Sequence, residues 1–199
     1  MANIFPHKKS VSRAMKEKMH GHRGFTLWLT GLPSSGKSSI ASELEHLLHK
    51  KGCFTVLLDG DTVRSGLNSD LGFSKRDREE NVRRVGEMAR TLTENGNIVL
   101  VSLISPFRKT RNSVRAGMRR GDFVEVYVSC PPEECEKRDP KGLYKRARAG
   151  KIPRFTGVSS PYEKPLKPEI IVDTMKSSVD QSAQKIYRYL LARKYLKNE

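Results

Sequence analysis

A glycine-rich segment that ends in lysine and serine carries the clearest chemistry in this sequence. It reads Gly31, Leu32, Pro33, Ser34, Ser35, Gly36, Lys37 and Ser38, and Ser39 follows it. An apolar run precedes the segment and apolar residues at helical spacing follow it, which is the context of a phosphate-binding loop. In such a loop main-chain amides and the helix N-terminus surround the phosphates, lysine contacts the β- and γ-phosphates, and serine binds Mg²⁺. The segment therefore predicts a site for a nucleoside triphosphate with Mg²⁺.

Two aspartates follow the next apolar run, residues 53–58. Asp59 and Asp61 flank Gly60, and Arg64 comes one turn later. One carboxylate can take the proton of an attacking hydroxyl and the other can join the Mg²⁺ shell, as a kinase requires. A polar turn is the alternative, because Asp-Gly is common in turns. The phosphate-binding loop favours the catalytic interpretation, with Arg64 directed at the acceptor.

A helix expected at residues 74–95, with Ser74 as its N-cap, carries a guanidinium and an amide on one face. Arg78 and Asn81 are three residues apart and therefore share that face. The pair would suit an anionic nucleotide acceptor. For Arg83 and Arg84 alone, a solvated helix face is the better interpretation.

Two aromatic residues and one serine lie in loops expected near the same edge. Phe73 and Phe155 could each be a core anchor or a functional ring. Ser105 follows an apolar run, where it could cap the next helix or touch phosphate. Residues 139–168 are basic and punctuated by glycine and proline, which indicates a mobile lid over the triphosphate.

Apolar runs that alternate with helical segments must position these side chains. We expect strands at residues 25–30, 53–58, 97–104, 123–128 and 169–173. Strands separated by helices predict an α/β fold of three layers, with a five-stranded, mostly parallel sheet and helices on both faces. Right-handed crossovers bring the loops after the strands to one edge, where ligands bind. Residues 1–23 are expected to form a polar N-terminal arm, and residues 24–199 a single domain.

Composition narrows the class of protein. The chain has 199 residues and a formal net charge of +16, without an apolar run long enough to span a membrane. Three cysteines, Cys53, Cys130 and Cys135, lack the spacing of a zinc site, which favours reduced thiols in the cytoplasm. The basic residues are spread along the chain and few aromatics lie among them, so binding of nucleic acid is a minor alternative.

Together these motifs resemble the adenylyl-sulfate kinase family over nearly the whole chain. The blocks Asp-Gly-Asp at residues 59–61, Asp-Arg-x-x-Asn at 77–81, Ile-Ser-Pro-Phe-Arg at 104–108 and Lys-Gly-Leu-Tyr-Lys at 141–145 carry the resemblance in this order. It implies the P-loop NTPase fold and transfer of the γ-phosphoryl group of ATP to the 3′-hydroxyl of adenosine 5′-phosphosulfate. It also implies a homodimer and a lid that closes on ATP.

The resemblance implies roles for individual residues. Asp61 would be the base, Lys37 would act on the phosphates, and Ser38 and Asp59 would hold Mg²⁺. The rings of Phe73 and Phe155 would enclose the adenine of the acceptor. ATP would also contact Arg138, Lys145 and Arg148, and the acceptor would contact Asp59, Arg64, Phe73, Arg78, Asn81, Ile104, Ser105, Lys141, Leu143 and Phe155. Parts of the family are described with a phosphoserine at the position of Ser105; direct in-line transfer is the preferred mechanism here.

The sequence departs from the family pattern at three positions. Pro33 and Ser34 replace the usual residues of the phosphate-binding loop, and Pro33 removes one amide donor. Thr62 stands where asparagine is usual. Three rival functions stay open on sequence alone: another small-molecule kinase, a nucleic-acid-binding ATPase, and a regulatory nucleotide-binding module.

Overall fold

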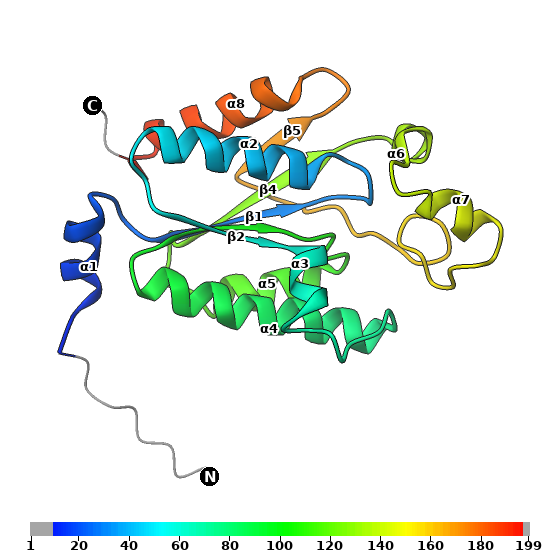
Figure 1. Ribbon diagram of the computed structural model, residues 1–199, viewed down its shortest axis with the longest axis horizontal. Coiled ribbons are helices and arrows are strands. Elements are labelled where there is room, and N and C mark those ends of the chain that lie inside the picture. Colours follow the sequence, from blue (N-terminus) through cyan, green and yellow to red (C-terminus); the bar gives the residue numbers. More distant parts are fainter. Residues whose placement is uncertain (1–9, 197–199) are drawn as a thin grey trace, which may run out of the picture.

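Five parallel strands form the centre of the protein in a computed structural model that describes residues 10–196 (Figure 1). The strand order across the sheet is β2-β3-β1-β4-β5. Every neighbouring pair is parallel, so the predicted, mostly parallel sheet is in fact parallel throughout. The strands are β1 (Phe25–Thr30), β2 (Thr55–Asp59), β3 (Ile98–Ser102), β4 (Phe123–Ser129) and β5 (Ile170–Asp173).

Helices cover both faces of the sheet, which confirms the predicted layers. In Figure 1, α2 and α8 lie on one face and α4 and α5 on the other, while α6 and α7 extend beyond the end of the sheet. The helices of the described chain are α1 (Arg13–His20), α2 (Lys37–Lys50), α3 (Gly60–Ser65), α4 (Lys75–Glu94), α5 (Arg108–Ala116), α6 (Pro132–Arg138), α7 (Leu143–Arg148) and α8 (Val179–Ala192).

Successive side chains of the central strand β1 point to opposite faces of the sheet, so the hydrophobic core is divided into one part on each face. Leu27 and Leu29 pack in the cluster under α2 and α8, whereas Trp28 between them packs with residues of α4. A third, smaller cluster joins α6 and α7 to the phosphate-binding loop; it comprises Leu32, Cys130, Cys135, Tyr144, Ala147 and Phe155. The third cluster therefore attaches the predicted lid segment, residues 139–168, to the domain.

Local capping explains where α4 begins, and a distant contact explains where α5 begins. Ser74 and Asp77 form a capping box, which confirms Ser74 as the N-cap of α4. The prediction that Ser105 could cap the next helix is wrong, because Phe107 occupies the N-cap of α5 and has no side-chain cap bond. Instead the carboxylate of Glu163 accepts a hydrogen bond of 2.8 Å from the first helical amide, that of Arg108.

The N-terminal helix is held against the end of the sheet. Arg13 in α1 donates hydrogen bonds to the buried carboxylate of Asp122 and, at 2.7 Å, to the carbonyl of Gly24. Residues 1–9 of the predicted arm lie outside the described residues. Between residues 10 and 196, none of the helices has the length and apolar character needed to cross a membrane.

Candidate functional site

The phosphate-binding loop occupies the turn between β1 and α2, at the carboxyl edge of the sheet. Gly36 has φ of 98° and is the N-cap of α2, so the chain turns into the helix through a conformation that favours glycine. A Cβ atom at Gly31 would come within 2.5 Å of the Val128 carbonyl oxygen, so this position also requires glycine. The loop therefore packs its main chain closely against β4 and leads directly into a helix N-terminus. A glycine-rich turn followed by a helix N-terminus is the geometry that binds phosphate.

Lys37 begins α2 and is almost completely buried. Its ammonium donates a hydrogen bond of 2.7 Å to the Leu32 carbonyl, within its own loop. Burial lowers the pKa of Lys37 to about 8, although the carboxylates of Asp59 and Asp61 act in the opposite direction. The lysine is therefore a desolvated cation at the centre of the loop, where its attraction for an anion is strongest.

Oxygen ligands gather next to the lysine. The hydroxyl of Ser38 donates a hydrogen bond of 2.6 Å to Asp59 and lies 3.2 Å from the hydroxyl of Ser102. Asp59 and Ser102 face each other in the register of β2 and β3. A carboxylate and hydroxyls beside a phosphate site form the donor set that Mg²⁺ uses, because Mg²⁺ takes few protein ligands and completes its shell with phosphates and water. No group of three or more His, Cys, Asp or Glu within residues 10–196 could hold a metal ion without such help.

Asp61 is the exposed carboxylate of the pair at the end of β2. It lies in the first turn of α3, whose N-cap Asp59 accepts a hydrogen bond of 3.1 Å from the Asp61 amide. The Asp61 side chain is 75% exposed and forms an ion pair with Lys141 of the lid segment. This ion pair raises the pKa of Lys141. The two predicted site residues, 80 positions apart in sequence, are thus in direct contact.

Arg64 and Phe73, both predicted to contact the acceptor, lie against each other. The guanidinium of Arg64 donates to the carbonyls of Leu71 and Gly72, at 3.2 and 3.1 Å, and lies 4.5 Å from the centre of the Phe73 ring. Phe73 is 58% exposed, so its ring is accessible from solvent. Phe155, in contrast, is buried and packs edge-on against Tyr144 at 4.9 Å.

Arg78 connects the loops that carry these two rings. Its Nε donates to the Phe73 carbonyl at 3.0 Å, and its other nitrogens donate to Thr156 and to the Arg154 carbonyl. Asn81, one turn later, accepts a hydrogen bond of 3.0 Å from the buried Asn68. In this conformation the guanidinium that the sequence assigned to the acceptor positions the Phe73 and Phe155 loops.

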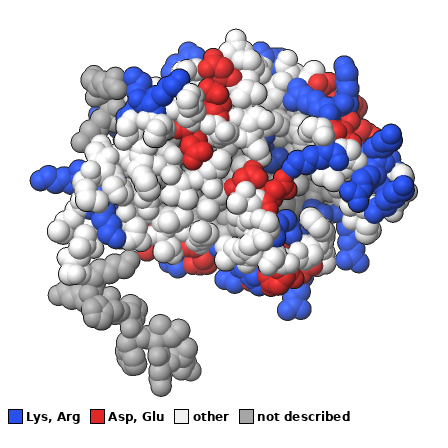
Figure 2. Space-filling view, in the orientation of Figure 1, with Lys and Arg blue, Asp and Glu red and all other residues white. Residues whose placement is uncertain are grey.

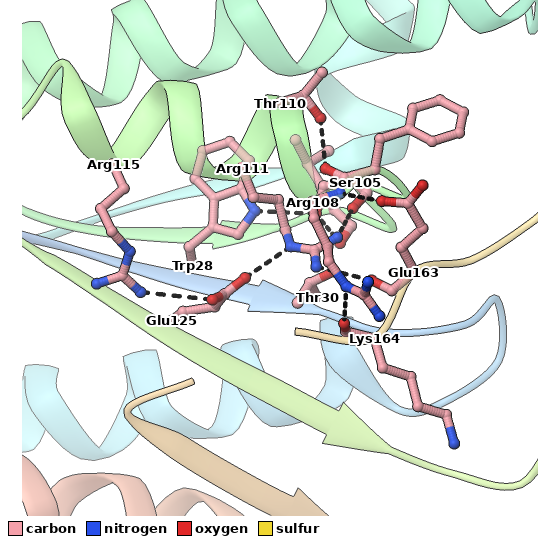
Figure 3. A network of polar contacts seen from close by, with 12 residues as sticks. Trp28, Thr30, Ser105, Arg108, Thr110, Arg111, Arg115, Glu125, Glu163 and Lys164 are labelled. Atoms are coloured by element: carbon pink, nitrogen blue, oxygen red, sulfur yellow. Dashed lines mark hydrogen bonds and ion pairs between the residues drawn. The ribbon is translucent and has the colours of Figure 1, made fainter. Parts of the chain in front are cut away.

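The hydroxyl of Ser105 points into the protein (Figure 3). It accepts a hydrogen bond of 3.0 Å from the indole nitrogen of Trp28 and donates one of 3.1 Å to Thr30, and the residue is 3% exposed. Thr30 in turn donates to the Ile104 carbonyl at 2.7 Å. The main chain at Ser105 has φ of 39°, an uncommon value for a residue other than glycine.

A buried arginine holds the Ser105 loop in this conformation (Figure 3). Arg111 is 1% exposed and pairs with Glu125 of β4 at 2.7 Å. Its remaining nitrogens donate to the carbonyls of Ser105 and Glu163, at 2.6 and 2.8 Å. The pair therefore ties the loop after β3 to the C-terminal part of the lid segment.

Tyr144 joins the lid segment to the phosphate-binding loop. Its hydroxyl donates a hydrogen bond of 3.2 Å to the carbonyl of Pro33. Pro33, whose nitrogen cannot donate, is thus an anchor for α7 through its oxygen. Leu143 packs beside Tyr144 in the same small cluster.

The other predicted ATP contacts lie on or beside α6 and α7. Arg138 donates to the carbonyl of Thr174 at 2.9 Å and pairs with Glu134, while Arg148 makes two hydrogen bonds of 2.9 Å with Glu136. Lys145 is exposed. Figure 2 shows Lys and Arg side chains gathered at the end of the molecule where α6 and α7 lie, with a group of acidic side chains beside them. The lid segment therefore presents a mainly basic surface near the phosphate-binding loop.

Several residues that organise the site were absent from the sequence prediction. They are Trp28, Glu125, Tyr144 (which entered the sequence prediction only as part of a family block), Thr156 and Glu163. All but Glu125 act through partners at least 55 positions away, and Glu125 acts through Arg111, 14 positions away. One sequence signal was available: Glu125 interrupts an apolar strand, and a charge at such a position requires a buried partner.

Comparisons with known proteins agree with this geometry. The sequence profile of the family described as "Adenylylsulphate kinase" matches residues 23–173. An adenylyl-sulfate kinase of Geotalea uraniireducens (strain Rf4) is 49% identical over 188 residues, which cover 94% of this chain and 90% of the relative. A probable adenylyl-sulfate kinase of Halalkalibacterium halodurans is 50% identical over 190 residues, 96% of this chain and 94% of the relative. The solved Mycobacterium tuberculosis APS kinase, in complex with AMPPNP and APS, superposes with a TM-score of 0.80 at 46% identity and covers 85% of this chain and 98% of its own.

The buried lysine predicts a dependence of stability on pH. Lys37 has a pKa of about 8 in the folded protein and an ordinary value of 10.5. The unfolded chain therefore binds this proton more tightly than the folded chain does. As a result, the free energy of unfolding of the wild-type protein should rise as pH rises from 8 to 10.5. Lys37→Met removes this penalty, so we expect a gain of about 1 to 3 kcal/mol in urea unfolding near pH 7 that shrinks toward pH 10. Lys50→Met, on the exposed side of the same helix, is the control. Equal effects of both variants at each pH would contradict the prediction.

The buried ion pair between Arg111 and Glu125 predicts that removing its carboxylate lowers stability far more than removing an exposed carboxylate does. Glu125→Gln leaves the Arg111 guanidinium without its carboxylate in the interior, so we expect a loss of about 3 kcal/mol in thermal or urea unfolding. The control is Asp70→Asn, which removes an exposed carboxylate from Arg84 and should leave the midpoint nearly unchanged. Similar midpoints for the two variants would show that the Arg111 pair contributes little.

Proposed function

Because the chain belongs to the adenylylsulphate kinase family and is an ATP-dependent kinase, we propose that its site transfers the γ-phosphoryl group of ATP to the 3′-hydroxyl of adenosine 5′-phosphosulfate. The products are 3′-phosphoadenosine 5′-phosphosulfate and ADP. The observation that carries the proposal is the contact between Asp61 and Lys141 beside the phosphate-binding loop. It brings together a candidate base, a candidate anion ligand and a triphosphate site at one edge of the sheet.

The triphosphate is bound by the loop and by the helix that follows it. The amides of residues 34–38 and the N-terminus of α2 receive the phosphate oxygens, while the buried Lys37 ammonium contacts the β- and γ-phosphates. Arg138, Lys145 and Arg148 add positive charge from the lid segment. We place this reaction in the cytoplasm, which fits ATP as co-substrate and a chain with three free thiols.

Mg²⁺ fits the oxygen donors beside the lysine. Ser38 and Asp59 would hold the ion, and when bound it would neutralise charge on the β- and γ-phosphates. The hydrogen bond between Ser38 and Asp59 keeps these oxygens together at the end of β2. Asp59 also caps α3, so the same carboxylate positions Asp61.

The acceptor is held on the side of Asp61. Phe73 offers an exposed ring, Arg64 lies against that ring, and Arg78 fixes the loop on which it stands. A sulfated nucleotide carries negative charge at its 5′ end, which suits the basic residues Lys141 and Arg64. Phe155 supports the second loop from within the Tyr144 cluster, and adenine stacking on it would require that ring to become accessible.

The reaction is a direct in-line displacement. The 3′-oxygen of the acceptor forms a bond to the γ-phosphorus as the bond from that phosphorus to the bridging oxygen of ADP breaks, and Asp61 takes the hydroxyl proton. The hydroxyl of Ser105 would have to leave Trp28 and Thr30 to become phosphorylated. We therefore assign Ser105 to positioning of the loop after β3.

The first test is acceptor-dependent formation of ADP. We expect ADP from ATP and Mg²⁺ only when adenosine 5′-phosphosulfate is present. Gluconate, shikimate and nucleosides serve as alternative acceptors in the same assay. Faster turnover with one of these would assign the chain to another small-molecule kinase, and hydrolysis stimulated by RNA or DNA without an acceptor would favour a nucleic-acid-binding ATPase.

The second test concerns the base. Asp61→Asn removes the proton acceptor while keeping the size of the side chain, so we expect kcat to fall at least about a hundredfold. Binding of ATP should persist, because the loop and Lys37 are unchanged. Asp70→Asn is the matched control, since it neutralises another exposed aspartate. Near-normal turnover of Asp61→Asn would remove Asp61 from this role.

A further inference from the structure

Helix α1 is attached to the domain through polar side chains. The residues that make these contacts are Arg13, Lys16, Glu17 and His20. Arg13 binds the carboxylate of Asp122, and Glu17 accepts a hydrogen bond of 2.8 Å from the Gly24 amide. The side of α1 that faces the domain is therefore its polar side.

Apolar side chains on the other side of α1 are exposed. Met15 and Met19 are four residues apart, which places them on one side of the helix, and Val11 comes four residues earlier, just before the helix begins. Val11, Met15 and Met19 are 46%, 57% and 79% exposed. Phe54, just before β2, is 58% exposed, and its ring lies 5.8 Å from that of His20 at the end of α1. We call Val11, Met15, Met19 and Phe54 the α1 patch.

This orientation of α1 is the reverse of the usual one. A surface helix ordinarily packs its apolar side against the core and turns its polar side to water. In α1 no residue is buried, and the two methionines point away from the contacts that hold the helix. Exposed apolar side chains that gather in one place indicate a surface for a partner, whereas single ones need no explanation.

Exposed basic residues gather at the same end of the molecule as the α1 patch. Loops that precede the strands of a parallel sheet meet at its amino edge, opposite the phosphate-binding loop. The exposed basic residues of α1 and of these connections, with those that follow α8, are Lys18, Lys50, Lys51, Arg119, Arg120, Arg193 and Lys194. In Figure 1, α1 lies at the end of the molecule opposite α6 and α7, and Figure 2 shows Lys and Arg side chains projecting from that end.

Arg23 joins the segments that carry several of these charges. It lies between α1 and β1, and its guanidinium donates a hydrogen bond of 3.2 Å to the Gly121 carbonyl, next to Arg120. The same group lies 4.9 Å from the centre of the Tyr195 ring, next to Lys194. The basic residues before β4 and after α8 are thus held close to the end of α1.

The carboxylates in contact with α1 are already paired. Asp122 is 3% exposed and binds both Arg13 and Arg23. Glu17, the one acidic residue of α1, binds Arg13 at 2.7 Å. Glu94, near the end of α4, lies 3.9 Å from Arg90. Positive charge therefore dominates around the α1 patch.

From these features we propose that the α1 patch and the basic residues around it dock the protein on an anionic lipid membrane. Met15 and Met19 would enter the boundary between headgroups and acyl chains, while Lys and Arg side chains contact lipid phosphates. The positive charge fits any polyanion, but the exposed apolar side chains fit a partner that also has an apolar interior. A lipid bilayer has both properties. A polynucleotide would instead favour several stacking rings, and the patch offers only that of Phe54.

Docking through α1 leaves the phosphate-binding loop open to solvent. Helix α1 precedes β1 and the loop follows it, so the length of this strand separates the two surfaces. The strand has six residues, which corresponds to about 20 Å. A membrane at the amino edge would therefore face away from the candidate site.

Compensation of helix dipoles is the competing explanation for the charges. Lys50 and Arg193 lie at the C-terminal ends of α2 and α8, where a cation stabilises the helix. This effect accounts for basic residues at helix ends one by one. It gives no reason for α1 to turn its methionines outward, so the methionines are the sharper test.

Co-sedimentation with lipid vesicles tests the proposal. We expect the wild-type protein to bind phosphatidylcholine vesicles that contain phosphatidylglycerol, and not vesicles of phosphatidylcholine alone. The variant M15Q/M19Q keeps good helix formers in α1 but removes the apolar side chains, and its partition coefficient should fall at least about tenfold. The matched control is L166Q/I171Q, which removes two side chains of similar exposure, 76% and 51%, and should bind like the wild type.

Charge reversal tests the second half of the surface. R119E/R120E places negative charge next to the membrane, so we expect the partition coefficient to fall at least about tenfold. K137E/K167E makes the same change in net charge at exposed positions on α6 and before β5, and should leave binding nearly unchanged. Circular dichroism and the unfolding midpoint of each variant check that it is folded.

Three results would overturn the proposal. The first is absence of binding to the anionic vesicles at a salt concentration of about 0.15 M. The second is binding that M15Q/M19Q does not weaken, because the surface would then recognise charge alone. The third is binding of an RNA oligonucleotide in preference to vesicles, which would assign the basic residues to nucleic acid. These measurements need no nucleotide, so their outcome is independent of the acceptor assay.

Discussion

The site is built around one buried lysine ammonium, that of Lys37. Lys37 is 7% exposed and rests on a carbonyl of its own loop. Removing a cation from water costs free energy, and the Coulomb attraction of a bound triphosphate would offset that cost. Gly31 lies against the Val128 carbonyl, where a Cβ atom would not fit, and Gly36 turns the chain into α2 with φ of 98°. The stability penalty of this buried cation and its attraction for an anion thus have the same origin, the removal of the ammonium from water.

Around this lysine, a few buried contacts hold segments that are distant in sequence. Arg111 joins β4, the loop after β3 and the end of the lid segment. Arg78 does the same for the loops of Phe73 and Phe155. Both guanidinium groups bind carbonyl oxygens, and an arginine can satisfy several carbonyls at fixed angles. Irregular loops at the site therefore gain defined positions from two arginines on helices.

The sequence predicted what depends on neighbours along the chain. The phosphate-binding loop, the paired aspartates and the capping box at Ser74 are contiguous patterns, and the parallel sheet follows from alternation of strands and helices. It could not predict that Glu163 caps α5, because the partners are 55 residues apart. It also placed Phe73 and Phe155 as equals, whereas tertiary packing exposes one ring and buries the other. The roles of individual residues on ligands depend on such packing.

Through Pro33 the phosphate-binding loop also anchors the segment that carries α7. Its carbonyl is bound by the hydroxyl of Tyr144, whose ring packs against Phe155. An outward displacement of α7 would break this hydrogen bond and separate the two rings, so Pro33 in the phosphate-binding loop and Phe155 would both lose their contact with Tyr144. The phosphate-binding loop and the Phe155 ring are thus connected through the phenol of one residue, Tyr144.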